Sequence, residues 1–174
     1  NWGEVSETFD GLDQTSGKIT EIITQEIEKS VDDFSYDSRD YSDYKTGPKT
    51  INNGHFSFVS YKGVNDYLAR LNREISYYYV PPTTKDFILR DLNDDVQKEF
   101  LMPLVEKIKE EKPNDKIAQA NMAISIVQGI PYDWDGLYSM DLNARYPYQV
   151  VYENKGVCGE KSELLAFLLR ELGF

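Results

Sequence analysis

Residues 152–174 read YENKGVCGEKSELLAFLLRELGF, and this stretch decides the fold because it places the only cysteine at the start of a long apolar helix. Gly156 permits a sharp turn, and Glu160 and Glu163 fall in the first helical turn, where the helix dipole favours negative charge. Cys158 is therefore predicted at a positive helix terminus. Unpaired N–H groups there favour the thiolate and offer a donor to an oxyanion. A lone cysteine is also often a buried small residue without chemistry, and position alone does not separate the two interpretations.

The stretch resembles the nucleophile motif of the transglutaminase-like cysteine enzymes, a superfamily related in architecture to papain-like proteases. The match begins with Gly156-Val157-Cys158-Gly159-Glu160 and continues through the leucines of the helix to its leucine-glycine end. Two upstream blocks support it, residues 126–132 (IVQGIPY) and 146–148 (YPY), so the resemblance covers residues 116–174. It implies an α+β fold of which this chain holds the helix-rich first half, preceded by an N-terminal helical extension.

The resemblance implies thiol-mediated acyl transfer on a protein or peptide substrate, with Cys158 as the nucleophile and no cofactor. Water resolves the thioester in a peptidase and an amine resolves it in a cross-linking transglutaminase; hydrolysis is the commoner expectation. The backbone N–H of Cys158 is the first oxyanion donor. The family often adds a side-chain donor, for which Tyr132 and Trp134 are the candidates by position, although either ring, and Trp134 more readily, suits a hydrophobic core. Gln128 is set aside because that position belongs to a helix face in the family.

A cysteine nucleophile also needs a base, and no histidine follows Cys158 in this sequence. The family order implies a histidine and then an aspartate downstream, so the first explanation is a fragment whose partners lie after residue 174 or on a companion C-terminal fragment. The apolar helix supports this, because a helix apolar on all sides needs cover and this chain has little strand material to supply it. Two alternatives stay open: His55 as the base in a permuted order, or a catalytically inactive binding or structural module.

The composition limits the classes of partner and ligand that the chain is expected to bind. The chain has 19 basic and 30 acidic residues, a net charge of −11, which argues against nonspecific binding to nucleic acid or anionic membranes. One cysteine excludes an internal disulfide and one histidine leaves zinc short of ligands, so no metal site is predicted; Asp133 and Asp135 are weak candidates. No stretch approaches the length of a membrane span. The start at Asn1 fits a removed signal peptide or anchor, hence an extracellular or membrane-anchored location, and equally a trimmed chain.

We expect two parts, an N-terminal extension over residues 1–82 and a transglutaminase-like domain over residues 83–174 that is incomplete at its C-terminal end. Hydrophobic periodicity predicts helices over residues 18–34, 64–78 and 115–128 and a half-buried strand over residues 55–61. Pro103 is expected to kink the helix around it or to divide it into two.

Overall fold

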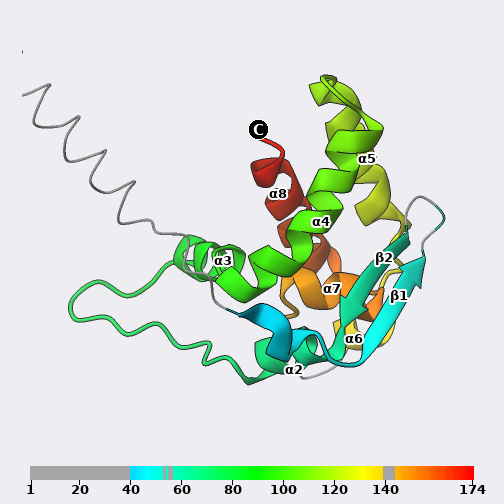
Figure 1. Cartoon of the computed structure of the whole chain (residues 1–174). Coiled ribbons are helices and arrows are strands. Elements are labelled where there is room, and N and C mark those ends of the chain that lie inside the picture. The colour runs from blue at the N-terminus through cyan, green and yellow to red at the C-terminus, as the bar shows by residue number, and fades with distance from the viewer. Residues whose placement is uncertain (1–39, 53, 55–56, 139–143) are drawn as a thin grey trace, which may run out of the picture. The chain divides into compact units, whose positions relative to one another are not determined.

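Helices and one β-hairpin make up the part of the chain that the computed structural model describes, residues 40–52, 54, 57–138 and 144–174. Residues Tyr41–Phe174 form one unit. Its first element is the short 3-10 helix η1 (Tyr41–Tyr44). The elements that Figure 1 labels follow in this order: β1 (Pro48–Asn52), β2 (Ser57–Tyr61), α2 (Lys62–Arg70), α3 (Thr84–Leu92), α4 (Asp95–Glu111), α5 (Lys116–Gly129), α6 (Trp134–Tyr138), α7 (Pro147–Glu153) and α8 (Cys158–Glu171). The fold is α+β and rich in helix. The helix expected over residues 18–34 lies outside the described residues.

The hairpin confirms the strand that alternation predicts. β1 and β2 pair antiparallel, with Ile51 opposite Phe58. Along β2 the buried residues are Phe58 and Ser60, whereas Val59 between them faces outward with 48% of its surface exposed. β1 was not predicted, because Ile51 is its one buried residue and a single apolar position makes no pattern.

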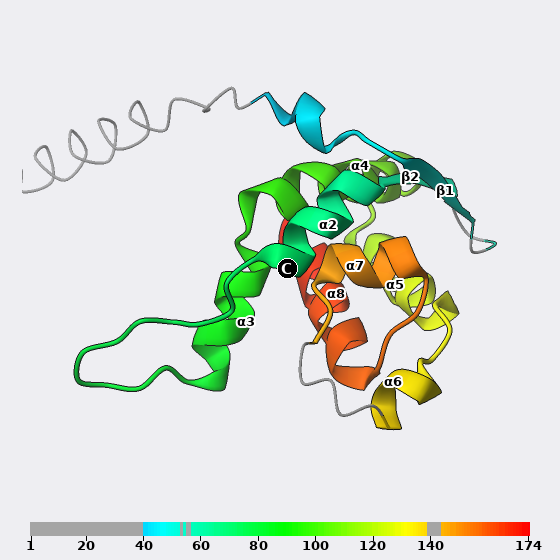
Figure 2. The ribbon, with the colours of Figure 1, turned by 90° about the horizontal axis from the view of Figure 1, so that it is seen from below.

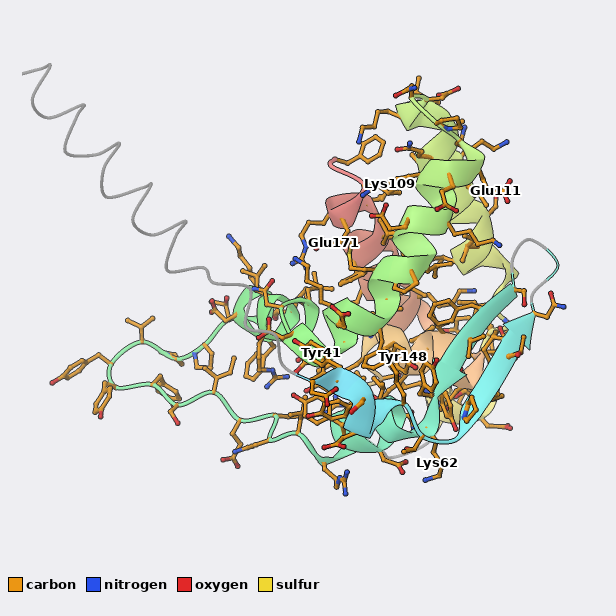
Figure 3. The ribbon with its side chains drawn as sticks, viewed as in Figure 1. Tyr41, Lys62, Lys109, Glu111, Tyr148 and Glu171 are labelled. Carbon is orange, nitrogen blue, oxygen red and sulfur yellow. The ribbon has the colours of Figure 1, made fainter. Side chains whose placement is uncertain are left out.

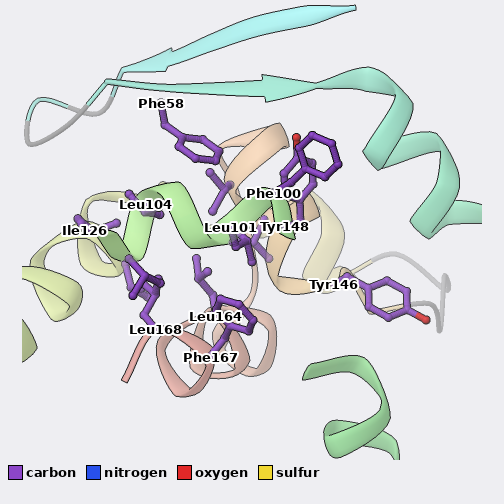
Figure 4. Packing of buried hydrophobic residues seen from close by; sticks show 14 of the residues in the cluster. Phe58, Phe100, Leu101, Leu104, Ile126, Tyr146, Tyr148, Leu164, Phe167 and Leu168 are labelled. Atoms are coloured by element: carbon purple, nitrogen blue, oxygen red, sulfur yellow. The ribbon is translucent and has the colours of Figure 1, made fainter. Parts of the chain in front are cut away.

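Helix α4 runs through the middle of the hydrophobic core. Figure 4 shows Leu101 and Leu104 of α4 between Phe58 of the hairpin and Leu168 of α8. Leu101, Leu104 and Leu168 are at most 1% exposed. The core therefore joins the hairpin, near the beginning of the described chain, to α8 at its end.

An aromatic cluster fastens the hairpin to helix α7. The ring of Phe100 meets the rings of Tyr61 and Tyr148 edge-on, with centroids 5.6 and 6.4 Å apart. The backbone N–H of Tyr61 donates to the hydroxyl oxygen of Tyr148 at 2.6 Å. Burial raises the pKa of Tyr148 to about 12, so the phenol stays neutral. Figure 3 shows Tyr148 inside the fold, while Lys62 and Lys109 extend from its surface.

Helix α8 is covered mainly by other helices. Leu164, Phe167, Leu168 and Leu172 are buried, and α8 packs chiefly on α5 and α7, with further contacts to α3 and α4. The expectation that this chain lacks residues to bury the helix is therefore wrong for the face that carries these four residues. Other helices bury that face, where a sheet was expected to do so. Ala166 is exposed, and Leu165 and Leu169 are half-buried.

Two helix boundaries differ from the sequence-based expectation. α2 ends at Arg70, because Leu71 adopts an extended conformation (φ −62°, ψ 137°) and the following loop is held from elsewhere: the Arg73 guanidinium lies 4.4 Å from the ring centre of Tyr146. Pro103 lies within a single helix, α4. The break comes earlier, where Asp94 accepts a hydrogen bond from the Gln97 N–H at 2.8 Å and so begins α4.

Among the described residues, none of the helices has both the length and the apolar character that crossing a bilayer requires.

Candidate active site

Cys158 is the first residue of α8, as predicted, and it is exposed. Val157 precedes the helix in an extended conformation (φ −84°, ψ 172°), and its N–H donates to Glu160 Oε2 at 2.9 Å. Glu160 thus satisfies the N–H just ahead of the helix. The positive end of the helix dipole lies next to the thiol.

Gly156 lies where a larger residue would crowd its neighbours. A Cβ at this position would lie 3.1 Å from Val150 Cγ1 on α7 and 3.3 Å from Lys161 Cγ on α8. Its φ is not positive, unlike that of Gly173. The sharp turn expected of Gly156 is therefore replaced by a close approach: the segment that leads into Cys158 passes tightly between two helices.

The segment before α6 pairs with this approach and brings Tyr132 to the cysteine. The N–H of Gly156 donates to the Pro131 carbonyl, and the N–H of Asp133 donates to the Gly156 carbonyl, each at 3.2 Å. These two bonds make a parallel bridge between Tyr132 and Gly156. Figure 2 shows α6 beside the loop that enters α8. Residues distant in sequence therefore meet at the start of α8.

Tyr132 lies beside Cys158, which influences its titration. Partial burial first, and hydrogen bonding with the Cys158 thiol second, raise the pKa of Tyr132, while a hydrogen bond with the Cys158 backbone lowers it by less. The phenol therefore keeps its proton at neutral pH and can donate it in a hydrogen bond. Of the two candidate side-chain donors, Tyr132 is the one that the bridge to Gly156 brings beside Cys158.

Trp134 supports Tyr132 from the side. The two rings lie 4.7 Å apart between centroids at an angle of 50°. Trp134 is the first residue of α6 and is 63% exposed, so the alternative of a core ring is wrong. Its exposed ring leaves apolar surface open beside Tyr132.

Arg145 connects the elements around the cysteine. Its guanidinium lies 2.7 Å from Asp133 Oδ2, 2.8 Å from Glu153 Oε2 and 3.1 Å from Glu160 Oε2. Its backbone N–H also donates to Glu160 Oε1 at 2.7 Å. Lys155 adds a second cation, 3.5 Å from Asp133. One side chain thus joins the Tyr132 segment, the end of α7 and the first turn of α8.

The charges of this network favour their ionised forms. Burial alone would lower the pKa of Arg145, but the bond with Glu153 and the charges of Glu153 and Glu160 raise it above the ordinary value. The pKa of Asp133 is lowered, first by the Gly136 N–H, which donates at 3.0 Å, and then by Arg145 and Lys155, against an opposing effect of burial. Buried carboxylates that are paired in this way stay charged.

The other sequence candidates lie apart from this site or are otherwise occupied. Gln128 is exposed near the end of α5, in keeping with its having been set aside. Asp133 is occupied by Arg145, and the described residues contain no cluster of side chains suited to hold a metal. His55 lies outside the described residues. Arg145 and Glu153 were not predicted as site residues, because their spacing in the sequence gives no indication that their side chains meet.

A groove among the described residues lies away from the cysteine. It is lined by the loop that follows α2 and by α3, including Arg73, Ile75, Tyr77, Pro82 and Phe87. Cys158 and Tyr132 are not part of it. The candidate site is an open surface at the start of α8.

Comparison with known proteins gives no relative for this chain: no family model, no curated protein and no solved structure matches it.

Proposed function

We propose that this chain supplies the nucleophile of a transglutaminase-like cysteine enzyme that hydrolyses an amide bond of a protein or peptide. One observation carries the proposal: exposed Cys158 begins α8, and the bridge between Tyr132 and Gly156 brings the Tyr132 segment beside it. The resemblance over residues 116–174 points to the family, and the placement of Cys158 and Tyr132 is what such a reaction requires.

In the proposed reaction, the Cys158 thiolate attacks the amide carbonyl carbon. A C–S bond forms and the carbonyl electron pair moves to oxygen, where the N–H of Cys158 and the O–H of Tyr132 donate hydrogen bonds. Collapse of this intermediate breaks the C–N bond, and the amine leaves with a proton. Water then adds to the thioester and expels the thiolate as the carboxylic acid forms.

The proton acceptor of the thiol is proposed to be a histidine oriented by an aspartate, both in sequence after residue 174. With substrate bound, the Tyr132 hydroxyl donates to the carbonyl oxygen from beside the Cys158 N–H.

Alkylation of Cys158 tests the nucleophile. Iodoacetamide should modify the native protein faster at neutral pH than the same protein unfolded in urea, because only the folded chain presents the helix terminus. Cys158→Ser controls for reaction elsewhere. Equal rates in native and unfolded protein would remove the basis for an enzyme and leave a binding or structural module.

Tyr132→Phe tests the second donor. The variant should fold as wild type, since the ring and its contact with Trp134 are kept. Its Cys158 should be acylated by p-nitrophenyl acetate about tenfold more slowly, less than the ~10²–10³ lost with an oxyanion donor in a complete site. Trp134→Phe is the control, and an equal loss of acylation rate there would mean that ring packing, not the hydroxyl, matters.

Adding a small primary amine to the acylated wild type distinguishes hydrolysis from cross-linking.

A further inference from the structure

Three carboxylates and two cations surround the start of α8, and their arrangement bears on the thiol. Asp133 and Glu160 are each 5% exposed, so water screens their charges poorly. Glu160 lies in the first turn, within the same helical turn as Cys158. An unpaired negative charge in this turn would oppose the formation of a nearby thiolate.

We propose that Arg145 is a positioning residue for Cys158: its guanidinium neutralises the carboxylates of Asp133 and Glu160 and holds the Tyr132 segment against the first turn of α8. The inference rests on the proposed function, which makes Cys158 the nucleophile.

The contacts of Arg145 support both parts of this role. One Nη lies 2.7 Å from Asp133, the residue next to Tyr132, and the other lies 3.1 Å from Glu160. The Arg145 side chain is 18% exposed, so its position is set by protein contacts rather than by water. Lysine cannot reproduce them, because a single ammonium group lacks the planar fork that spans several carboxylates.

The other charged groups nearby do not replace it. Lys155 is 45% exposed and reaches Asp133 at 3.5 Å and Glu153 at 4.0 Å. Lys161, on α8 itself, donates to the Ile130 carbonyl at 2.6 Å. Among the described residues, Arg145 is thus the cation that forms an ion pair with Glu160.

The test compares alkylation rates of Cys158 in the full chain. Arg145→Met should lower the rate with iodoacetamide at neutral pH about tenfold, the effect of a tenfold smaller thiolate population, and move the pH profile to higher pH. Arg145→Lys should lower it less. The matched control is Arg170→Met at the far end of α8, about 18 Å from Cys158 at 1.5 Å per residue. Arg170 also links elements, through bonds of 2.8 Å to Leu92 and Asn93, so its loss should cost stability and leave the rate unchanged.

A second substitution distinguishes the loss of the Arg145 charge from the loss of its structural contacts. Glu160→Gln in the Arg145→Met background should restore part of the rate, because it removes the unpaired charge; its single amide oxygen can keep the bond from the Val157 N–H but not also the one from the backbone N–H of residue 145. An Arg145→Met variant that stays folded by circular dichroism and reacts like wild type would overturn the inference. If that variant does not fold, Arg145→Lys reacting like wild type would do so. The proposed function fails on a different comparison, native against unfolded wild type, so the two failures are distinguishable.

Discussion

At the scale of single residues, Glu163 shows how burial near the site affects the stability of the whole fold. Its Oε2 is buried, and no donor among the described residues reaches it. Burial first, and the charges of Asp91 and Glu160 next, raise the pKa of Glu163, although Arg73 and Arg90 oppose the effect. The folded protein therefore holds this proton more tightly than the unfolded chain does.

The sign of the pH effect follows from that difference. The unfolded chain releases the Glu163 proton near its ordinary pKa of 4.5 and the folded protein releases it at higher pH, so the free energy of unfolding falls as pH rises through this window. Glu163→Gln should leave stability almost unchanged at about pH 4 and increase it by about 0.5 kcal/mol at about pH 7, a small gain because the group is only partly buried. Urea unfolding at the two pH values measures it.

The matched control is Glu99→Gln, which replaces an exposed carboxylate on α4. It should change stability little and equally at both pH values. If Glu163→Gln behaves in the same way, the burial of Glu163 has no energetic consequence.

The same scale shows what a sequence can tell about a site. The place of Cys158 was predictable because helix starts depend on neighbours in sequence. Arg145 was not, because its three carboxylates lie at positions 133, 153 and 160 and meet only after two loops and α7 have folded. Tyr132 was predictable in part. The sequence around it resembles the family, but its position beside Cys158 depends on the bridge to Gly156, which sequence alone does not indicate.

At the scale of elements, α8 has faces of different burial, and substitutions should separate them. Leu168 is 0% exposed, whereas Leu165 is half-buried. Leu168→Ala should cost about 3 kcal/mol, because it leaves a cavity among packed helices. Leu165→Ala should cost about 1 kcal/mol, since water can fill the space. Urea unfolding compares them, and similar losses would mean that both faces are covered alike.

Two helices also show where tertiary contacts override the conformation that the local sequence favours. The apolar stripe that predicted a helix over residues 64–78 continues past Arg70, but the structure replaces it with a loop in which Arg73 stacks on Tyr146. Pro103 was expected to kink its helix or to divide it into two, and the helix is not divided: α4 contains Pro103, with Leu101 and Leu104 buried on either side. The buried contacts of neighbouring residues outweigh the hydrogen bond that proline cannot make.

At the scale of the whole molecule, the open question is where the folding unit begins. The division expected from the sequence, an extension over residues 1–82 and a domain over 83–174, stays a prediction. Phe58, Val64 and Leu68 precede that boundary, and each is at most 6% exposed in the shared core. The N–H of Tyr61 and the hydroxyl of Tyr148 also bond across it.

These contacts predict how truncated chains will behave. Each fully buried apolar side chain contributes about 1.5–3 kcal/mol, so removing three of them, with the hairpin that covers Phe100, approaches the roughly 5–15 kcal/mol that stabilises a typical domain. A chain of residues 41–174 should therefore unfold in urea in one cooperative transition. A chain of residues 83–174 should keep helical circular dichroism but lose cooperativity, because Phe100 and Tyr148 lose the partners that fix their packing. A cooperative transition in residues 83–174 would instead establish the boundary at residue 82 and make the hairpin and α2 an accessory to an independent core.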